Sequence, residues 1–242
     1  MQLRTVCQRP SSSASPGMLV RWGAALALLC GLGAPAMPAL ATDVEGKLVL
    51  GSYRVLERGP EVYWELQNAV RATKRERIDA ARELTVVLLG KRPMPGNKTR
   101  PVVLRGGSLL PSTIAVQVGT TLRLRNEDEI AHELHAVGLT GFSAEATSPR
   151  HERTVRLSQT GDWPLRDRLV VHVSGHLHVL SNLVATAQPD ADGRYRFSGV
   201  SPGRYQLKVF HGPNEIANKR VVVGSKGELS VPPIVLKAPK RK

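Results

Sequence analysis

The chain has 242 residues, a formal net charge of +14 at pH 7 and two cysteines, Cys7 and Cys30. Aromatic and basic residues do not interleave in the way that stacks bases, which argues against nucleic acid as a partner. Ser143, Ser148 and Ser158 do not lie in a G-x-S-x-G elbow, and the sequence has no Walker loop or G-x-G-x-x-G motif. We therefore expect no catalytic or cofactor-binding residues and no enzymatic activity.

Residues 1–41 read as a secretory signal peptide. Three arginines precede the apolar run "WGAALALLCGLGAPAM", and "ALA" ends at Ala41. This pattern predicts cleavage after Ala41 and a periplasmic or secreted protein. The run is shorter than the about 20 apolar residues that span a bilayer, so we expect no transmembrane segment. A lipoprotein site at Cys30 is the weaker alternative, because Leu29 before it is bulky.

Cleavage would remove both cysteines and leave Met94 as the last methionine. The remaining chain would still be strongly basic, since residues 1–41 carry only three of the arginines. An exported basic protein meets anionic envelope polymers, membrane headgroups or other envelope proteins. An envelope protein or an anionic polymer is therefore the predicted partner, and the oligomeric state is left open.

Residues 42–100 predict short strands and the one helix of the chain. "DVEGKLVLGSYRVL" is rich in β-branched and apolar residues, which favours one or two strands. From Glu61 to Leu84, apolar residues recur at helical intervals among charges, which predicts an amphipathic helix. "LTVVLLG" then predicts a strand, and "KRPMPGNKTRP" a loop rich in proline and glycine.

Residues 101–187 predict a β-sandwich of short alternating strands, including "TTLRLRNED", "AHELHAV" and "RLVVHV". Residues 188–237 predict a second, smaller β module. There "DADG" forms a tight turn, "RYRF" and "RYQLKVFH" alternate as strands, and we expect a three-stranded meander. Residues 238–242 form a basic tail.

Two stretches resemble known families. "DADGRYRFSGVSPGRYQLKVFH" resembles the signature of carboxypeptidase-regulatory-like (transthyretin-like) modules, and "STIAVQVGTTLRLRNEDEIAHELHAVG" resembles the plastocyanin-like cupredoxin region of exported methylamine-utilisation-like proteins. The resemblance implies a mainly β chain: a cupredoxin-like Greek-key β-sandwich followed by a small transthyretin-like β-sandwich segment. In the cupredoxin family the motif delivers the first copper-ligating histidine, which would be His132 here.

The same resemblance implies that type 1 copper has been lost. Copper-binding members carry a C-x-x-H-x-x-M run, and aligning it on His176 places Val173 at the cysteine and Val179 at the methionine. Blue-copper electron transfer needs a His₂Cys site. The trimmed chain has no cysteine, so we expect no blue-copper electron carrier.

Two interpretations of the histidines stay open. In the first, a sulfur-free site binds Cu(II) or Zn(II), with carboxylate from Asp128, Glu129 or Glu133; its candidate ligands are His132, His176, His178, His172 and His135. In the second, which we favour, no metal is bound. The histidines of "VVHVSGHLHVL" then lie on the solvent face of a strand whose core face holds Val171, Val173, Leu177 and Val179.

The leading functional hypothesis is an exported, non-enzymatic recognition or accessory module of the cell envelope, without a cofactor. The alternative is a periplasmic copper- or zinc-binding protein. His151, in the charged turn "SPRHERT", is expected to be an exposed loop residue, and His211, in "VFHGPN", to pack near a turn.

Overall fold

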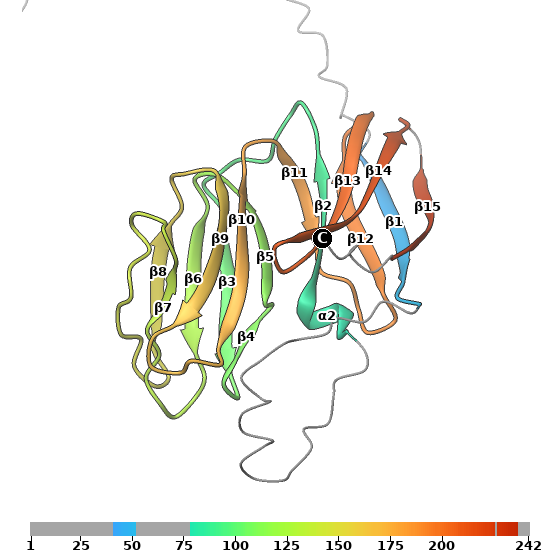
Figure 1. Ribbon diagram of the computed structural model, residues 1–242. Helices are drawn as coiled ribbons and strands as arrows, with labels where there is room; N and C mark the ends of the chain where they lie inside the picture. Colours follow the sequence, from blue (N-terminus) through green and yellow to red (C-terminus); the bar gives the residue numbers. More distant parts are fainter. Residues whose placement is uncertain (1–40, 52–77, 226, 237–242) are drawn as a thin grey trace, which may run out of the picture. The chain divides into compact units, whose positions relative to one another are not determined.

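The computed structural model describes residues 41–51, 78–225 and 227–236. The predicted signal peptide, most of the predicted helix and the basic tail lie outside these ranges. The described residues are nearly all β, and they form four sheets packed as two sandwiches (Figure 1). The predicted fold class, a mainly β chain built of sandwiches, is confirmed. No helix among the described residues is long and apolar enough to cross a bilayer.

Residues 99–180 form one sandwich, which we call the insert sandwich. One sheet has the order β4-β3-β6-β8 and the other β5-β10-β9-β7. Their bounds are β3 (Thr99–Arg105), β4 (Ser108–Leu110), β5 (Thr113–Gln117), β6 (Thr121–Asn126), β7 (Leu134–Ala136), β8 (Glu152–Arg156), β9 (Gly161–Asp167) and β10 (Ser174–Leu180). The pairs β3–β6 and β5–β10 are parallel, so the connections cross between the sheets.

Strands from both sides of this insert form the other sandwich, which we call the terminal sandwich. Its sheets have the orders β12-β1-β15 and β11-β2-β13-β14. Their bounds are β1 (Thr42–Val49), β2 (Leu84–Leu89), β11 (Leu183–Ala187), β12 (Arg194–Val200), β13 (Gly203–His211), β14 (Asn214–Val223) and β15 (Glu228–Val235). The boundaries 42–100, 101–187 and 188–237 stay predictions, but strand pairing joins β1 and β2 to strands that follow the insert.

The predicted three-stranded meander after "DADG" is wrong. The predicted turn is present: the Asp190 side chain accepts from the amides of Asp192 and Arg194, and Gly193 has a φ of +78°. However, β12 pairs with β1, whereas β13 pairs with β2 and β14. The chain changes sheets between β12 and β13 because β12 joins β1 whereas β13 joins β2, and β1 and β2 belong to different sheets.

The predicted helix from Glu61 to Leu84 is wrong at Ile78, Asp79 and Leu84, which are not helical. Most of it lies outside the described residues. Within them, α2 covers only Ala80–Glu83. Its N-cap residue, Asp79, has an extended backbone conformation, and the Asp79 side chain accepts hydrogen bonds from the amides of Ala81 and Arg82. Leu84 already starts β2, in which all six residues are buried. A helix could not continue here, because β2 is paired on both edges.

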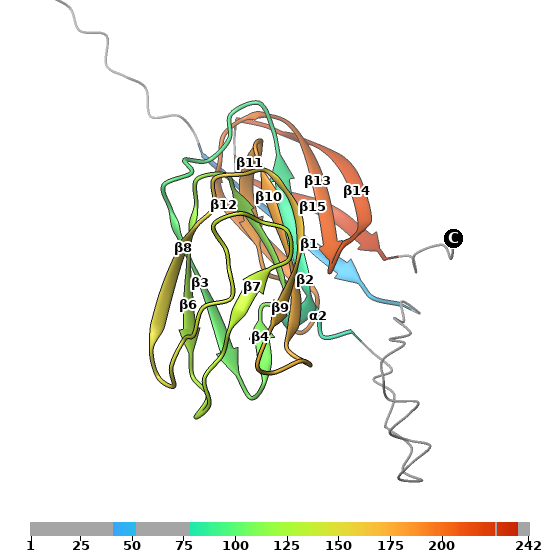
Figure 2. The same cartoon turned by 60° about the vertical axis from the view of Figure 1, so that its left-hand side comes forward.

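The two sandwiches pack against each other through β2, β11 and β13 on one side and β5 and β10 on the other (Figures 1 and 2). All residues of β2 and β5 are buried, because both faces of these strands are covered. In β5, Ile114 and Val116 enter the core of the insert sandwich, while Ala115 enters a small cluster with residues of the terminal sandwich. We call this contact region the junction.

Candidate metal site

Two of the predicted histidines lie at the junction. Alternation along β10 sends Leu177 and Val179 into the insert core, and His176 and His178 to the opposite face. That face is not open to solvent: His176 is 7% exposed and His178 2%. The predicted solvent-facing position of these side chains is therefore wrong, because strands of the terminal sandwich cover this part of the sheet.

His178 has an acceptor at each ring nitrogen. Its Nε2 lies 2.8 Å from the carbonyl oxygen of Gly212, in the turn between β13 and β14, and its Nδ1 contacts the carboxylate of Asp162. The ring also stacks on Phe210, with centroids 4.2 Å apart. The Gly212 carbonyl requires a proton on Nε2, so Nδ1 must face Asp162 across a cation, either a proton or a metal ion.

His176 has a buried nitrogen without a partner. Its Nε2 is buried and makes no hydrogen bond, although an unpaired buried polar atom costs about 1–3 kcal/mol. Burial, and then the neighbouring His178, lower the pKa of His176 to about 4. The ring is therefore neutral at pH 7, and one of its nitrogens carries a lone pair that a metal ion can use.

Asp162 completes the cluster. It lies on β9 directly opposite His178 in the antiparallel register with β10. Ligand atoms of Asp162, His176 and His178 all lie within 4.8 Å of one another. The Asp162 side chain is 62% exposed. We call these three residues the junction cluster. Sequence analysis missed Asp162, although a hairpin register between "GDWPLRD" and "SGHLHVL" would have placed it beside His178.

His132 belongs to a different and fully paired arrangement. Its Nδ1 lies 2.9 Å from Asp167 Oδ2 and its Nε2 3.1 Å from Asp128 Oδ2, and the side chains of His132 and Asp167 are fully buried. Each ring nitrogen thus has a carboxylate within hydrogen-bonding distance. We call this Asp128–His132–Asp167 set the His132 bridge.

Backbone amides complete the His132 bridge. Asp128 accepts from Gly106 and Gly107, and Asp167 accepts from Leu169 and Val170 at 2.9 Å. The bridge thus joins the β3–β4 turn, the β6–β7 loop and the β9–β10 loop. Both nitrogens of His132 are engaged within it, and His132 is not among the residues of the junction cluster.

The other predicted ligands lie elsewhere. His172 is exposed in the loop between β9 and β10, and His135, on β7, is half-buried with its Nδ1 3.4 Å from the Glu133 carbonyl. Glu129 pairs with Arg150, and Glu133 lies 3.8 Å from Arg168. None of these residues belongs to the junction cluster.

The segment "RLVVHV" is a loop and not a strand. Val171 is 84% exposed, so its predicted position in the core is also wrong. Val173 and Val179 are buried in the insert core as expected. Because the loop ends at Val173, alternation starts only at Ser174, and His172 does not share a face with His176 and His178.

The remaining histidines have local partners. His151 is exposed, and its Nδ1 lies 2.8 Å from the Pro149 carbonyl of its own turn. His211 ends β13 next to the turn that contains Gly212, and its Nε2 lies 3.2 Å from Glu83 Oε2. Both positions agree with the sequence-based expectations.

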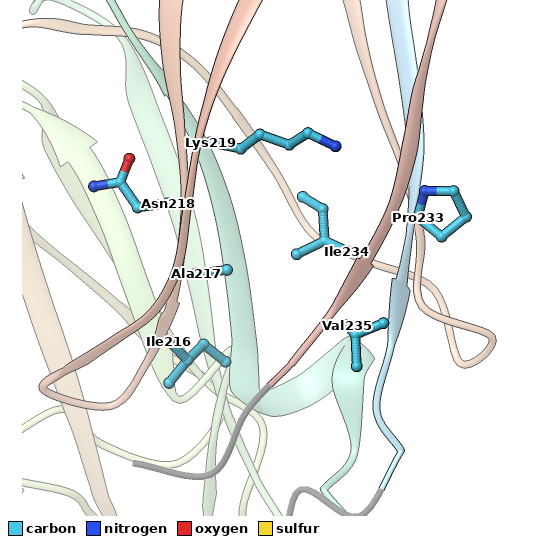
Figure 3. A pocket seen from close by; sticks show the side chains of 7 residues that line it. All are labelled: Ile216, Ala217, Asn218, Lys219, Pro233, Ile234 and Val235. Carbon is cyan, nitrogen blue, oxygen red and sulfur yellow. The ribbon is translucent and has the colours of Figure 1, made fainter. Parts of the chain in front are cut away.

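An apolar groove lies between the edge strands β14 and β15 (Figure 3). It is lined by Ile216, Ala217, Asn218, Lys219, Pro233, Ile234 and Val235. Lys219 is its one charged side chain, and its Nζ lies 3.4 Å from the Pro232 carbonyl. The groove lining contains no carboxylate and no histidine.

Comparisons with known proteins give only weak similarity. No family model matches the chain, and no curated protein matches it. Solved structures with a similar arrangement include an oxidized mutant of amicyanin, which has 16% identity and a TM-score of 0.31, covering 33% of this chain and 80% of that one.

Two further solved structures are similar to the same extent. A purple cupredoxin from Nitrosopumilus maritimus has 15% identity and a TM-score of 0.30, covering 33% of this chain and 98% of that one. A copper-containing nitrite reductase from Thermus scotoductus has 18% identity and a TM-score of 0.31, covering 38% of this chain and 23% of that one. These values are too low to transfer a site or an activity, so function must be inferred from this chain's own residues.

Proposed function

We propose that this protein binds one divalent metal ion, Cu²⁺ or Zn²⁺, at Asp162, His176 and His178. The observation that carries the proposal is the buried, unpartnered Nε2 of His176 beside the Asp162–His178 pair. An ion bound there would accept the lone pair of His176 and take the place of the proton between His178 and Asp162.

The donor set suits these ions. Two imidazole nitrogens and one carboxylate oxygen are common ligands of Zn²⁺ and Cu²⁺. Ligand atoms around a tetrahedral ion lie about 3.3 Å apart, and the three atoms here lie within 4.8 Å of one another. Asp162 is mostly exposed, so its side chain has room to adjust to an ion.

The surroundings favour holding a metal over turnover of a substrate. Phe210 and the Gly212 carbonyl cover His178 from the terminal sandwich, and the exposed side of the cluster is that of Asp162. A non-enzymatic role is therefore part of the proposal. The predicted signal peptide supports a site that would be loaded in the periplasm or outside the cell.

Metal analysis of the chain, purified without a histidine tag, tests this function. After incubation with Zn²⁺ or Cu²⁺ and removal of free ion, we expect about one equivalent in the wild type and less than a tenth in His176→Ala. His151→Ala is the matched control, because the exposed His151 ring has its hydrogen bond within its own turn. Equal metal content in wild type and His176→Ala would refute the proposed site.

A charged face supports the recognition role as a second candidate. The outer face of β3, β6 and β8 displays Arg105, Arg123, Arg125 and Arg156. Glu127 and Glu152 pair with three of them, so the face keeps a positive balance. Such a face suits an anionic polymer, and its binding to heparin as a probe would weaken with salt.

A further inference from the structure

The apolar contact between the two sandwiches is small. Each sandwich has a core of 17 buried apolar residues, whereas the apolar cluster at the junction has five. These five are Val87, Leu89, Ala115, Leu183 and Phe210. Because apolar burial scales with area, polar contacts have a larger share in holding the junction than in holding either core.

His178 contributes to both the cluster and the junction. It belongs to the insert sandwich, and its Nε2 donates to Gly212 in the terminal sandwich. The Gly212 amide in turn donates to the Thr113 hydroxyl on β5, at 2.8 Å, and that hydroxyl donates to the Glu83 carbonyl at 2.6 Å. Thr113 is the register partner of His176. The turn at Gly212 is thus held from two neighbouring strands of the insert sandwich.

We infer that metal binding at the junction cluster and packing of the β13–β14 turn against the insert sandwich are one coupled equilibrium. This inference rests on the proposed function. A metal on Nδ1 of His178 fixes the ring in the orientation and tautomer that donates from Nε2 to Gly212. Occupation of the site therefore holds the two sandwiches together, and loss of the ion loosens their contact.

Coupling of this kind is reciprocal, so a substitution that loosens the β13–β14 turn must weaken metal binding. Thr113→Val removes the acceptor of the Gly212 amide and leaves all three ligands in place. We expect the Kd for Zn²⁺, measured by calorimetry, to rise about fivefold or more. Val231→Ala is the control: it also destabilises the terminal sandwich, but Val231 lies in the core on β15, in the sheet that does not face the insert.

Hydrogen exchange gives the second measurement. In the wild-type chain, Zn²⁺ should slow exchange at residues 211–214 and in β10, and Thr113→Val should reduce this protection at the turn. Binding of Zn²⁺ with an unchanged Kd in Thr113→Val and no protection at the turn would overturn the inference while leaving the proposed function intact. Absence of Zn²⁺ and Cu²⁺ binding to the wild type would overturn both.

Discussion

The two histidine clusters of this protein use similar residues in different ways. In the His132 bridge, two carboxylates engage both nitrogens of one ring, and the carboxylates are themselves capped by backbone amides. In the junction cluster, the carboxylate of Asp162 contacts the His178 ring, and Nε2 of His176 has no partner. Both ring nitrogens of His132 are paired, whereas the junction cluster keeps one unpaired ring nitrogen, to which the proposed metal ion would bind. Histidine content alone therefore does not identify a metal site; unmet hydrogen-bonding capacity does.

The largest expected effect is at the His132 bridge. His132→Ala would remove the partner of the buried carboxylate of Asp167 and of the partly buried carboxylate of Asp128, and breaking such a buried pair costs about 3–5 kcal/mol. Urea unfolding should show this loss, while the metal content of the protein that remains folded stays at the wild-type level. A stable His132→Ala protein that no longer binds metal would reverse the roles assigned to the two clusters.

A substitution at His176 is expected to have the opposite effect on stability. His176→Leu removes the unpartnered buried nitrogen, so the metal-free protein should become more stable, by about 1 kcal/mol. The same variant should lose metal binding. Chemical denaturation in the presence of a chelator, compared with wild type, checks the sign. A loss of stability of similar size would mean that this ring has a partner in the metal-free protein.

A substitution at Asp162 should lower metal affinity with little change in the stability of the metal-free protein. Asp162→Asn removes the ligand charge but keeps the shape of the side chain, so affinity for Zn²⁺ should fall. Because the carboxylate is mostly exposed, the metal-free protein should change by less than about 1 kcal/mol. Calorimetry and urea unfolding of the same samples measure the two effects, and Asp192→Asn, in an exposed turn, is the control.

The smallest effect concerns pH and lies away from both clusters. The ion pair with Arg196, and then the Gly199 amide, lower the pKa of Asp43. A lowered pKa in the folded state gives stability that is present above the ordinary value of 3.8 and is lost as pH falls through the folded value. In Asp43→Asn, the stability should fall slightly less between pH 5 and 2 than it does in the wild type, as measured by thermal melting. An equal fall in both proteins would contradict this contribution.

The strand pattern of the chain was largely predictable from local alternation. β6 is a clear case, because Leu122 and Leu124 are buried while Arg123 and Arg125 are exposed. The partners with which the strands pair were harder to predict from the sequence. β1 pairs with β12 and β15, which lie more than 140 residues further along the chain, and local sequence has no information on such a distant partner.

The candidate site was predictable only in part. The H-x-H spacing placed His176 and His178 on one face, as the structure shows. Whether that face is exposed to solvent depends on β13, which is separated from β10 in the sequence by β11 and β12. Asp162 and Asp167 were not found, because their roles depend on the register of β9 and on the loop that follows it.

The interrupted course of the terminal sandwich sets an order of assembly. All strands of the insert sandwich lie within residues 99–180, so it can close as soon as that stretch exists. β1 and β2 must wait for partners that come after it, and long-range pairings of this kind form slowly. Gly212 and Phe210, which cover His178, belong to those late strands. We therefore expect the cover over His178 to form only after the three proposed ligands, which all belong to the insert sandwich, have been brought together.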